Sequence, residues 1–201
     1  MTKTEICNRA LTLLGESTII SIDQNTPNAI ALRNCYTFAL ENLLRTYNWN
    51  FAVKRANLAQ LVASPEFGYS YAYQLPGDFL RLKKSDTECR VEVEGDTLVT
   101  DSSSLRIVYI AYVEDTEKFD ASFSNFLAIQ LARELAFNIT SEASVADRLE
   151  ALYKEAKREA KKNDAQASTL TLFLNKQYTN RMATTRSGLT VNIPASIQTP
   201  L

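Results

Sequence analysis

The sequence predicts an α+β protein in which a small antiparallel β domain is inserted into a four-helix unit, followed by an extended C-terminal tail. Two segments before residue 50 and two after residue 114 carry apolar residues at helical spacing. The region between them changes to short runs bounded by turn residues, one of which alternates strictly between two faces. The predicted domains are a discontinuous helical domain (residues 1–50 and 114–167), an inserted β domain (51–113) and a C-terminal arm (168–201).

Two helices are expected before the strands. The first runs from about Thr4 to Leu14, and Gly15 after it suits the left-handed position that ends many helices. The second begins at Thr26–Pro27, because Thr is a good N-cap and Pro suits the first turn. It ends near Tyr47. Its apolar face is wide enough to have neighbours on two sides and consists of Leu32, Cys35, Tyr36, Phe38, Ala39, Leu43, Leu44 and Tyr47.

Five or six short antiparallel strands are expected next. Tyr69, Tyr71 and Tyr73 alternate with smaller residues, which predicts that the tyrosines share one face of a strand. Gly95–Asp96 separates two short runs, and a two-residue loop with Gly first predicts a hairpin with a type II′ turn. The strand candidates lie at residues 51–61, 69–75, 79–83, 90–94, 97–100 and 105–113.

Two further helices are expected after the strands. The third helix covers about Ser122 to Thr140, and the fourth begins at Ser141 or Ser144. The apolar stripe of the fourth helix fades after Ala156, where a basic run follows, made of Lys157, Arg158, Lys161 and Lys162. A basic run near a helix C-terminus is more typical of a solvated face that complements the helix dipole than of nucleic-acid contact.

The tail after residue 168 differs in composition from the rest of the chain. It contains no Asp or Glu and three positive charges, so its net charge is +3 within a chain of net charge −1. No useful periodicity follows Thr179, and we expect this segment to be mobile in the isolated protein. Its aliphatic side chains are too many for an inert tail, however. Such a segment typically becomes ordered by binding along a partner.

Trp49, the only tryptophan, lies where the second helical pattern stops and the strand region begins. Asn48 and Asn50 on either side of it favour the end of a helix over its continuation. A large aromatic side chain at such a change of pattern is most simply a packing anchor. We therefore expect Trp49 and Phe51 to hold the helical and strand parts together rather than to stack on a ligand.

The amino-acid composition argues against several common kinds of active site. The chain has no His, which excludes His-based triads, zinc sites and general bases. Its three Cys are widely spaced and are expected to be free thiols, and its five Gly are scattered singly and form no phosphate-binding loop. We therefore expect no catalytic residue, no cofactor and no metal. Asp78, Asp86 and Asp96 could supply paired carboxylates, but nothing in the sequence places two of them together.

Membrane insertion and secretion are not expected either. The longest apolar run, Ile107–Val113, is seven residues and is typical of a buried strand. The first five residues lead into a helix without the shape of a signal peptide. The net charge of −1 provides no overall basic footprint for nucleic acid.

Several short motifs, in order along residues 6–165, resemble the tail tubular protein A family, the head-to-tail adaptor proteins of short-tailed bacteriophages. Each motif is short and structural, so their order carries more weight than any one of them. The tail after residue 168 adds nothing to the match. The motifs are Ala10-Leu11-x-Leu13-Leu14-Gly15-Glu16, Ile19-x-Ser21-Ile22, Ala29 with Ala31, Trp49-Asn50-Phe51-Ala52, and Tyr71-Ala72-Tyr73-Gln74-Leu75-Pro76-Gly77-Asp78-Phe79-Leu80-Arg81-Leu82.

The resemblance implies a non-enzymatic virion protein at the head–tail interface, assembled in the host cytoplasm. It implies a homo-oligomeric, dodecameric ring whose helical domain docks on the portal protein and whose β domain faces the tail nozzle protein. The ring would line the channel through which DNA passes, and tail fibres are a further candidate partner. In this setting the arm supplies candidate portal-binding residues, namely Lys176, Arg181, Arg186, Leu189, Val191, Ile193 and Leu201.

Two other hypotheses remain open from the residues alone. The first is a small nucleic-acid-binding regulatory protein that stacks bases on Tyr69, Tyr71 and Tyr73 and contacts phosphates through the basic run Lys157–Lys162. The second is an enzyme that uses a carboxylate pair. Salt-dependent DNA binding by the monomer would favour the first, and two carboxyl groups of raised pKa in one cleft would favour the second.

Overall fold

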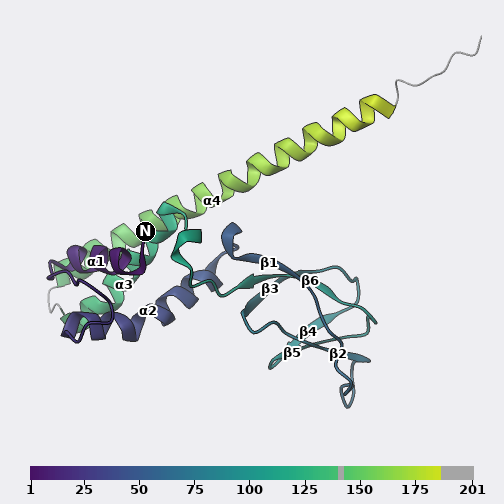
Figure 1. Cartoon of the computed structure of the whole chain (residues 1–201), viewed down its shortest axis with the longest axis horizontal. Coiled ribbons are helices and arrows are strands. Elements are labelled where there is room, and N and C mark those ends of the chain that lie inside the picture. The colour runs from purple at the N-terminus through teal and green to yellow at the C-terminus, as the bar shows by residue number, and fades with distance from the viewer. Residues whose placement is uncertain (140–142, 187–201) are drawn as a thin grey trace, which may run out of the picture. The chain divides into compact units, whose positions relative to one another are not determined.

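The structure is a computed structural model that describes the backbone of residues 1–139 and 143–186 and the side chains of residues 1–136 and 145–167. The chain divides into two compact units, Met1–Asp164 and Ala165–Leu201. Within the first unit, helices α1–α3 lie together and six short strands form a second group (Figure 1).

The α+β class is confirmed, with two helices before the strands and two after them (Figure 1). Short 3-10 turns, η1 and η2, flank the strand region. The elements in chain order are α1 (Lys3–Leu14), α2 (Pro27–Thr46), η1 (Asn50–Ala52), β1 (Val53–Asn57), β2 (Tyr71–Gln74), β3 (Phe79–Ser85), β4 (Val91–Glu94), β5 (Thr97–Thr100), β6 (Arg106–Ala111), η2 (Thr116–Lys118), α3 (Ala121–Ile139) and α4 (Ala143–Arg186).

Helix α1 has well-defined ends. The Thr2 hydroxyl accepts a hydrogen bond from the Glu5 backbone N–H, and the Glu5 carboxylate accepts one from the Thr2 backbone N–H, which is a capping box. Gly15 ends the helix with φ +78°, in the left-handed region predicted for it. The buried face of α1 packs on α3, which also contacts α2. Helix α3 is therefore the centre of the helical group.

The strands form two three-stranded antiparallel sheets, with strand orders β1-β6-β3 and β2-β5-β4. Strands β4 and β5 form the predicted hairpin. Gly95 has φ +61° and Asp96 does not have a positive φ, as a type II′ turn requires. Strand β6 is the central strand of its sheet and pairs with β1, so the two places where the chain passes between helices and strands lie side by side.

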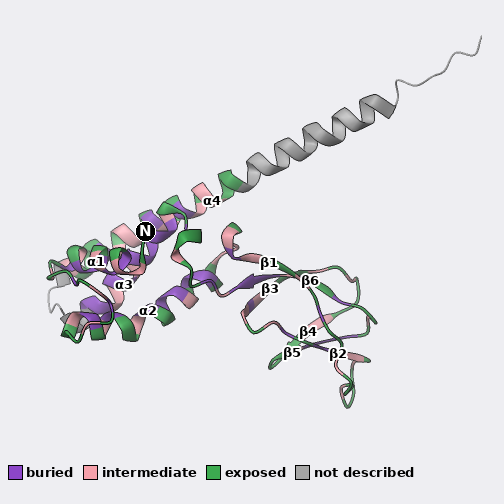
Figure 2. Ribbon diagram, viewed as in Figure 1, coloured by how far each residue is buried: buried purple, intermediate pink, exposed green. Residues whose placement is uncertain are grey.

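The buried core continues from the helices into both sheets (Figure 2). Ile6, Leu40 and Phe126 of the helices are completely or almost completely buried, and so are Leu98 and Ile110 of the strands. Burial of one aliphatic side chain contributes about 1.5–3 kcal/mol, so a shared core couples the stability of the two groups.

The C-terminal arm begins later than the sequence analysis predicted. Residues 168–186, expected in the extended arm, belong to α4, while residues 187–201 lie outside the described residues. Leu170, Leu172 and Leu174 have good helix propensity and, with Phe173, interrupt the polar run where α4 continues. No apolar stripe was evident there because the fourth helical pattern had faded after Ala156.

Candidate functional site

The junction between helices and strands is the best-defined candidate site, and Trp49 lies at its centre. The Trp49 side chain is 1% exposed, which agrees with the anchor role predicted for it. Its indole Nε1 donates a hydrogen bond of 2.8 Å to the Leu43 carbonyl, which also accepts from the Thr46 hydroxyl at 2.8 Å. Leu43 lies in the last turn of α2, where carbonyls have no intrahelical partner. Trp49 therefore satisfies the end of α2 as well as filling the core.

Trp49 belongs to an aromatic cluster that joins four elements of the chain. The Trp49 and Phe123 rings are 4.9 Å apart at 68°, and the Phe51 and Phe123 rings are 4.8 Å apart at 66°. Such edge-to-face pairs contribute roughly 0.5–1.5 kcal/mol each beyond their buried area. The cluster connects the end of α2, the η1 and η2 turns and α3, and consists of Tyr47, Trp49, Phe51, Phe119, Phe123 and Phe126.

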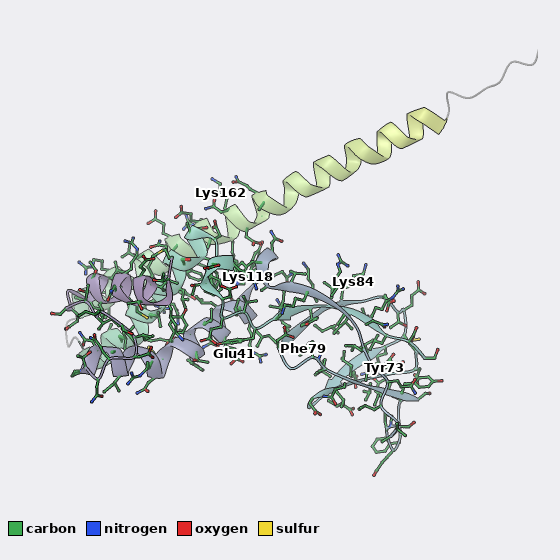
Figure 3. The ribbon with its side chains drawn as sticks, viewed as in Figure 1. Glu41, Tyr73, Phe79, Lys84, Lys118 and Lys162 are labelled. Carbon is green, nitrogen blue, oxygen red and sulfur yellow. The ribbon has the colours of Figure 1, made fainter. Side chains whose placement is uncertain are left out.

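Two arginines fix the other side of this junction. Arg45 of α2 donates from Nη1 to the Leu80 carbonyl of β3 at 2.8 Å, and its Nε pairs with Glu41 at 2.9 Å. Arg81 of β3 donates to the Asn48 amide oxygen at 2.8 Å. Figure 3 labels Glu41 on α2 and Phe79 at the start of β3, on either side of this contact. The angle between α2 and β3 is therefore set by hydrogen bonds as well as by packing.

A third contact links η1 to α4. The Asn50 backbone N–H donates to the Asp164 carboxylate at 2.8 Å, and the Asn50 amide donates to the Asp164 carbonyl at 2.6 Å. Burial raises the pKa of Asp164, and the Asn50 hydrogen bond opposes this shift. Asn50 was noted in the sequence as a helix terminator beside Trp49. Its long-range partner had no local signal.

The predicted tyrosine face is not an open platform. Tyr73 is 1% exposed and its hydroxyl donates to the Ser102 carbonyl at 2.8 Å. Tyr69 precedes β2. Tyr71 is half-buried, and Ala72 beside it is buried. Tyr71 and Tyr73 are two residues apart in β2 and lie on one face of it, as predicted, whereas Tyr69 lies outside the strand. Stacking of successive bases on all three rings would require exposure that Tyr73 does not have.

Two cations of the basic run lie over aromatic rings. Lys161 Nζ is 5.0 Å from the centre of the Tyr47 ring, and Lys157 Nζ is 5.8 Å from that of Tyr153. Both lysines are half-buried, whereas Arg158 and Lys162 are exposed. Cation–π contacts of this kind contribute about 0.5–1 kcal/mol at accessible sites. Half of the basic run thus has a structural role.

The three carboxylates considered for acid–base chemistry have separate partners. Asp78 precedes β3 and accepts hydrogen bonds from Lys54 at 2.6 Å and from Tyr109 at 2.9 Å. Asp86, after the other end of β3, pairs with Arg106 at 2.6 Å. Asp96 lies in the β4–β5 turn. Among the residues whose side chains are described, no group of three or more His, Cys, Asp or Glu could hold a metal ion.

Asp78 provides a pH-dependent test of this part of the fold. Its burial alone would raise the pKa, but hydrogen bonds from Lys54 and Tyr109 outweigh burial and lower it. A lowered pKa stabilises the folded state above about pH 4, the ordinary pKa of Asp, and this contribution is lost as the pH falls below it. We expect Asp78→Asn to lose about 1–2 kcal/mol at pH 7 and to approach the wild type below about pH 4. Chemical denaturation across this pH range measures the difference.

The matched control for Asp78→Asn is Glu66→Gln, which changes an exposed carboxylate in the segment between β1 and β2. This control should change the free energy of unfolding by less than about 0.5 kcal/mol at every pH. A difference between Asp78→Asn and the wild type that grows as the pH falls would show that the carboxylate does not stabilise the folded state.

The arm residues proposed for portal binding lie outside what can be described at the level of side chains. Lys176, Arg181 and Arg186 belong to α4, in the part of the helix of which only the backbone is described. Leu189, Val191, Ile193 and Leu201 lie outside the described residues. These seven residues therefore remain predictions from the sequence.

Sequence reasoning did not single out the exposed apolar residues of the first unit. Val62 and Phe67 lie in the segment between β1 and β2, and Phe67 is 87% exposed. Phe38 of α2 is 64% exposed, and Ile20 lies exposed between α1 and α2. Phe38 was assigned to the wide apolar face of the second helix, so its exposure corrects that assignment. Periodicity cannot separate a residue at the margin of an apolar face from one inside it.

No model of a known protein family matches the chain, and no similar sequence is found among curated proteins. No helix in the described part of the chain is both long and apolar enough to cross a membrane.

Proposed function

We propose that this protein is a structural protein of a short-tailed bacteriophage virion, an adaptor at the head–tail interface. In this role about twelve subunits form a ring between the portal protein and the tail nozzle protein. The ring lines the channel through which DNA leaves, and no catalytic step is assigned to it. The observation that carries the proposal is the insertion of two antiparallel sheets between α2 and α3, in the order that the resemblance requires.

The rigidity of the junction supports this proposal. An adaptor must hold one surface toward the portal and another toward the nozzle at a constant angle. The aromatic cluster, the Arg45–Leu80 hydrogen bond and the Asn50–Asp164 hydrogen bond all restrain that angle. A nucleic-acid-binding regulator has no comparable need for a fixed angle between its helices and its sheets.

Exposed apolar side chains on both groups of elements also support two docking surfaces. Phe38 belongs to the helical group and Phe67 to the strand group, and each is more than half exposed. Single apolar side chains are common on protein surfaces, so Phe38 and Phe67 supply one candidate contact position on each group of elements. We assign the helical group to the portal and the strand group to the nozzle.

The direct test is to mix the purified protein with assembled portal protein encoded by the same genome and to view the product by electron microscopy. We expect a second ring of about twelve subunits beneath the portal, with the symmetry of a closed cyclic assembly. Protein that stays unbound at micromolar concentrations of both components would contradict the proposal. Salt-dependent binding of the isolated protein to DNA would instead favour the nucleic-acid-binding alternative.

A further inference from the structure

The two sheets of the first unit have four edges, and two of them are covered. The outer side of β2 is occupied by residues 59–61, since the Leu61 N–H donates to the Ala72 carbonyl at 2.8 Å and the Gln74 N–H donates to the Ala59 carbonyl at 3.2 Å. An isolated bridge between Gln60 and Tyr73 completes this contact. Strand β2 therefore has partners on both sides.

Strand β3 is protected differently. Its register with β6 shifts twice, between Phe79 and Arg81 and between Leu82 and Lys84. Its Leu80 carbonyl also accepts the hydrogen bond from Arg45 of α2. Bulges and bound carbonyls are common ways in which proteins prevent an edge strand from pairing with another chain.

Strands β1 and β4 are the two open edges. Strand β1 pairs with β6 in unbroken register, from Val53 opposite Ile110 to Asn57 opposite Arg106. Strand β4 pairs with β5 in unbroken register over its four residues. Along the described residues, no further strand pairs with the outer side of either. A regular edge strand presents unpaired N–H and C=O groups that can accept another strand.

The two open edges carry opposite charge. Strand β1 contains Lys54 and Arg55, whereas β4 contains Glu92 and Glu94. Lys54 pairs with Asp78 and Glu92 pairs with Arg90, each within its own subunit. Among the side chains that the structure describes, Arg55 and Glu94 have no ion pair, and both are exposed. They are the charges left to recognise a partner.

Arg55 is also accessible in three dimensions. It lines an open groove of about 750 Å³ at the end of the β1-β6-β3 sheet, together with Lys84, Val108 and Arg106. In this sheet Arg55 is opposite Val108 of β6, which is in turn opposite Lys84 of β3, so the three lie in one row across the sheet. Asp86, which pairs with Arg106, and Glu88 also line this groove, and neither forms an ion pair with Arg55 among the described contacts.

We propose that β4 of one subunit pairs edge to edge with β1 of a second copy of this chain, with Glu94 facing Arg55 of the neighbour. The proposal rests on the ring proposed above and supplies its lateral contact. Because the contact uses two different surfaces, a joined pair of subunits still has one free β1 edge and one free β4 edge, and repetition closes a ring when the rotation per subunit divides the circle. Strand addition to a sheet edge is an established mode of protein recognition.

The charges suit this pairing whichever face of β1 is aligned with β4. Lys54 and Arg55 are consecutive, so one basic side chain lies on each face of β1. Glu92 and Glu94 are two residues apart and therefore share one face of β4. The acidic face of β4 thus always meets a basic side chain, and opposite charges across neighbouring strands are favourable.

The first test reverses the two free charges. We expect Arg55→Glu and Glu94→Lys, made separately, each to weaken self-association by about 5- to 30-fold, and the double variant to restore it to within about threefold of the wild type. Sedimentation equilibrium at low salt gives the dissociation constants. Two losses that add in the double variant, with no restoration, would overturn the proposed contact.

The second test blocks the backbone of β4 from outside the sheet. Because Gly95–Asp96 is a two-residue turn, Glu94 and Thr97 exchange hydrogen bonds and the N–H of Val93 points away from β5. Val93→Pro should therefore leave the hairpin intact and reduce self-association at least tenfold. Val93→Ala, which keeps the N–H, is the matched control and should associate like the wild type. Equal association by both variants, with unchanged circular dichroism, would overturn the pairing.

The third test traps the contact with a short bismaleimide. In a Cys89→Ser background the remaining thiols are poor nucleophiles, because burial raises the pKa of Cys7 to about 12 and that of Cys35 to about 11. Arg55→Cys mixed with Glu94→Cys should form cross-linked dimers faster than either variant alone. Cross-linking at the rate of a control mixture, Arg55→Cys with Glu66→Cys, would overturn the contact.

These experiments separate this contact from the proposed function. Rings that form on the portal but show no cross-link between positions 55 and 94 would overturn the edge pairing and leave the adaptor proposal standing. Cross-linking and charge-swap rescue in a protein that never binds portal would do the reverse.

Discussion

Replacing Trp49 with Ala is expected to lower the free energy of unfolding by about 3–5 kcal/mol, the range for deleting a large buried aromatic side chain. The substitution removes the ring contacts with Phe123 and Phe51 and the hydrogen bond to the Leu43 carbonyl. It leaves a cavity where α2, η1 and α3 meet. Chemical denaturation followed by circular dichroism measures the change without relying on the lost fluorophore.

Trp49→Phe is the matched control because it keeps an aromatic ring and removes the indole N–H. We expect it to lose less than half as much stability, including about 1 kcal/mol for the hydrogen bond to Leu43. A loss below about 1 kcal/mol for Trp49→Ala would show that the side chain is not an anchor. So would a wild-type fluorescence emission typical of a water-exposed indole.

Deleting residues 179–201 is expected to leave the first unit folded and to abolish stable binding to the portal. Met1–Asp164 is a compact unit with its own buried core, so the deletion removes no part of that core. It removes Arg181, Arg186 and the aliphatic residues of the arm. If two of these aliphatic side chains are buried against the portal, losing them removes about 3 kcal/mol or more of binding free energy. This corresponds to an affinity for the portal that is about 100-fold or more weaker.

The end of α4 at Arg186 defines a second, shorter deletion. Removing residues 187–201 keeps both arginines but deletes Leu189, Val191, Ile193 and Leu201. If aliphatic side chains supply most of the affinity and charges steer the encounter, the two deletions should bind portal almost equally weakly. Copurification of either truncated protein with portal at normal stoichiometry would contradict the arm's role, provided that both unfold like the full chain.

The parts of the fold that depend on neighbouring residues were predictable from the sequence. Gly15 ends α1 with a positive φ, and Gly95–Asp96 forms the expected hairpin turn, because both depend on the steric freedom of glycine. Thr26–Pro27 marks the start of α2 for an equally local reason. The aromatic at the change of pattern, Trp49, was predicted to be buried, and it is.

The parts that depend on distant residues were not predictable in the same way. The Asp164 partner of Asn50 is 114 residues away, and no local pattern indicates such a pair. The burial of Tyr73 depends on the loop at Ser102, and the capped edge of β2 depends on residues 59–61 that were predicted to continue an earlier strand. The open edges of β1 and β4 likewise cannot be identified until the pairing partners of every strand are known.

The pairing of β1 with β6 has a mechanical consequence. These two strands lead the chain out of α2 and back toward α3, and they are hydrogen-bonded to each other from Val53 opposite Ile110 onward. Two crossings joined in this way resist sliding along each other, since a shift of one strand past the other would break several ladder bonds together. A pull applied to the sheets should therefore reach α2 and α3 together, because neither crossing can slip without the other.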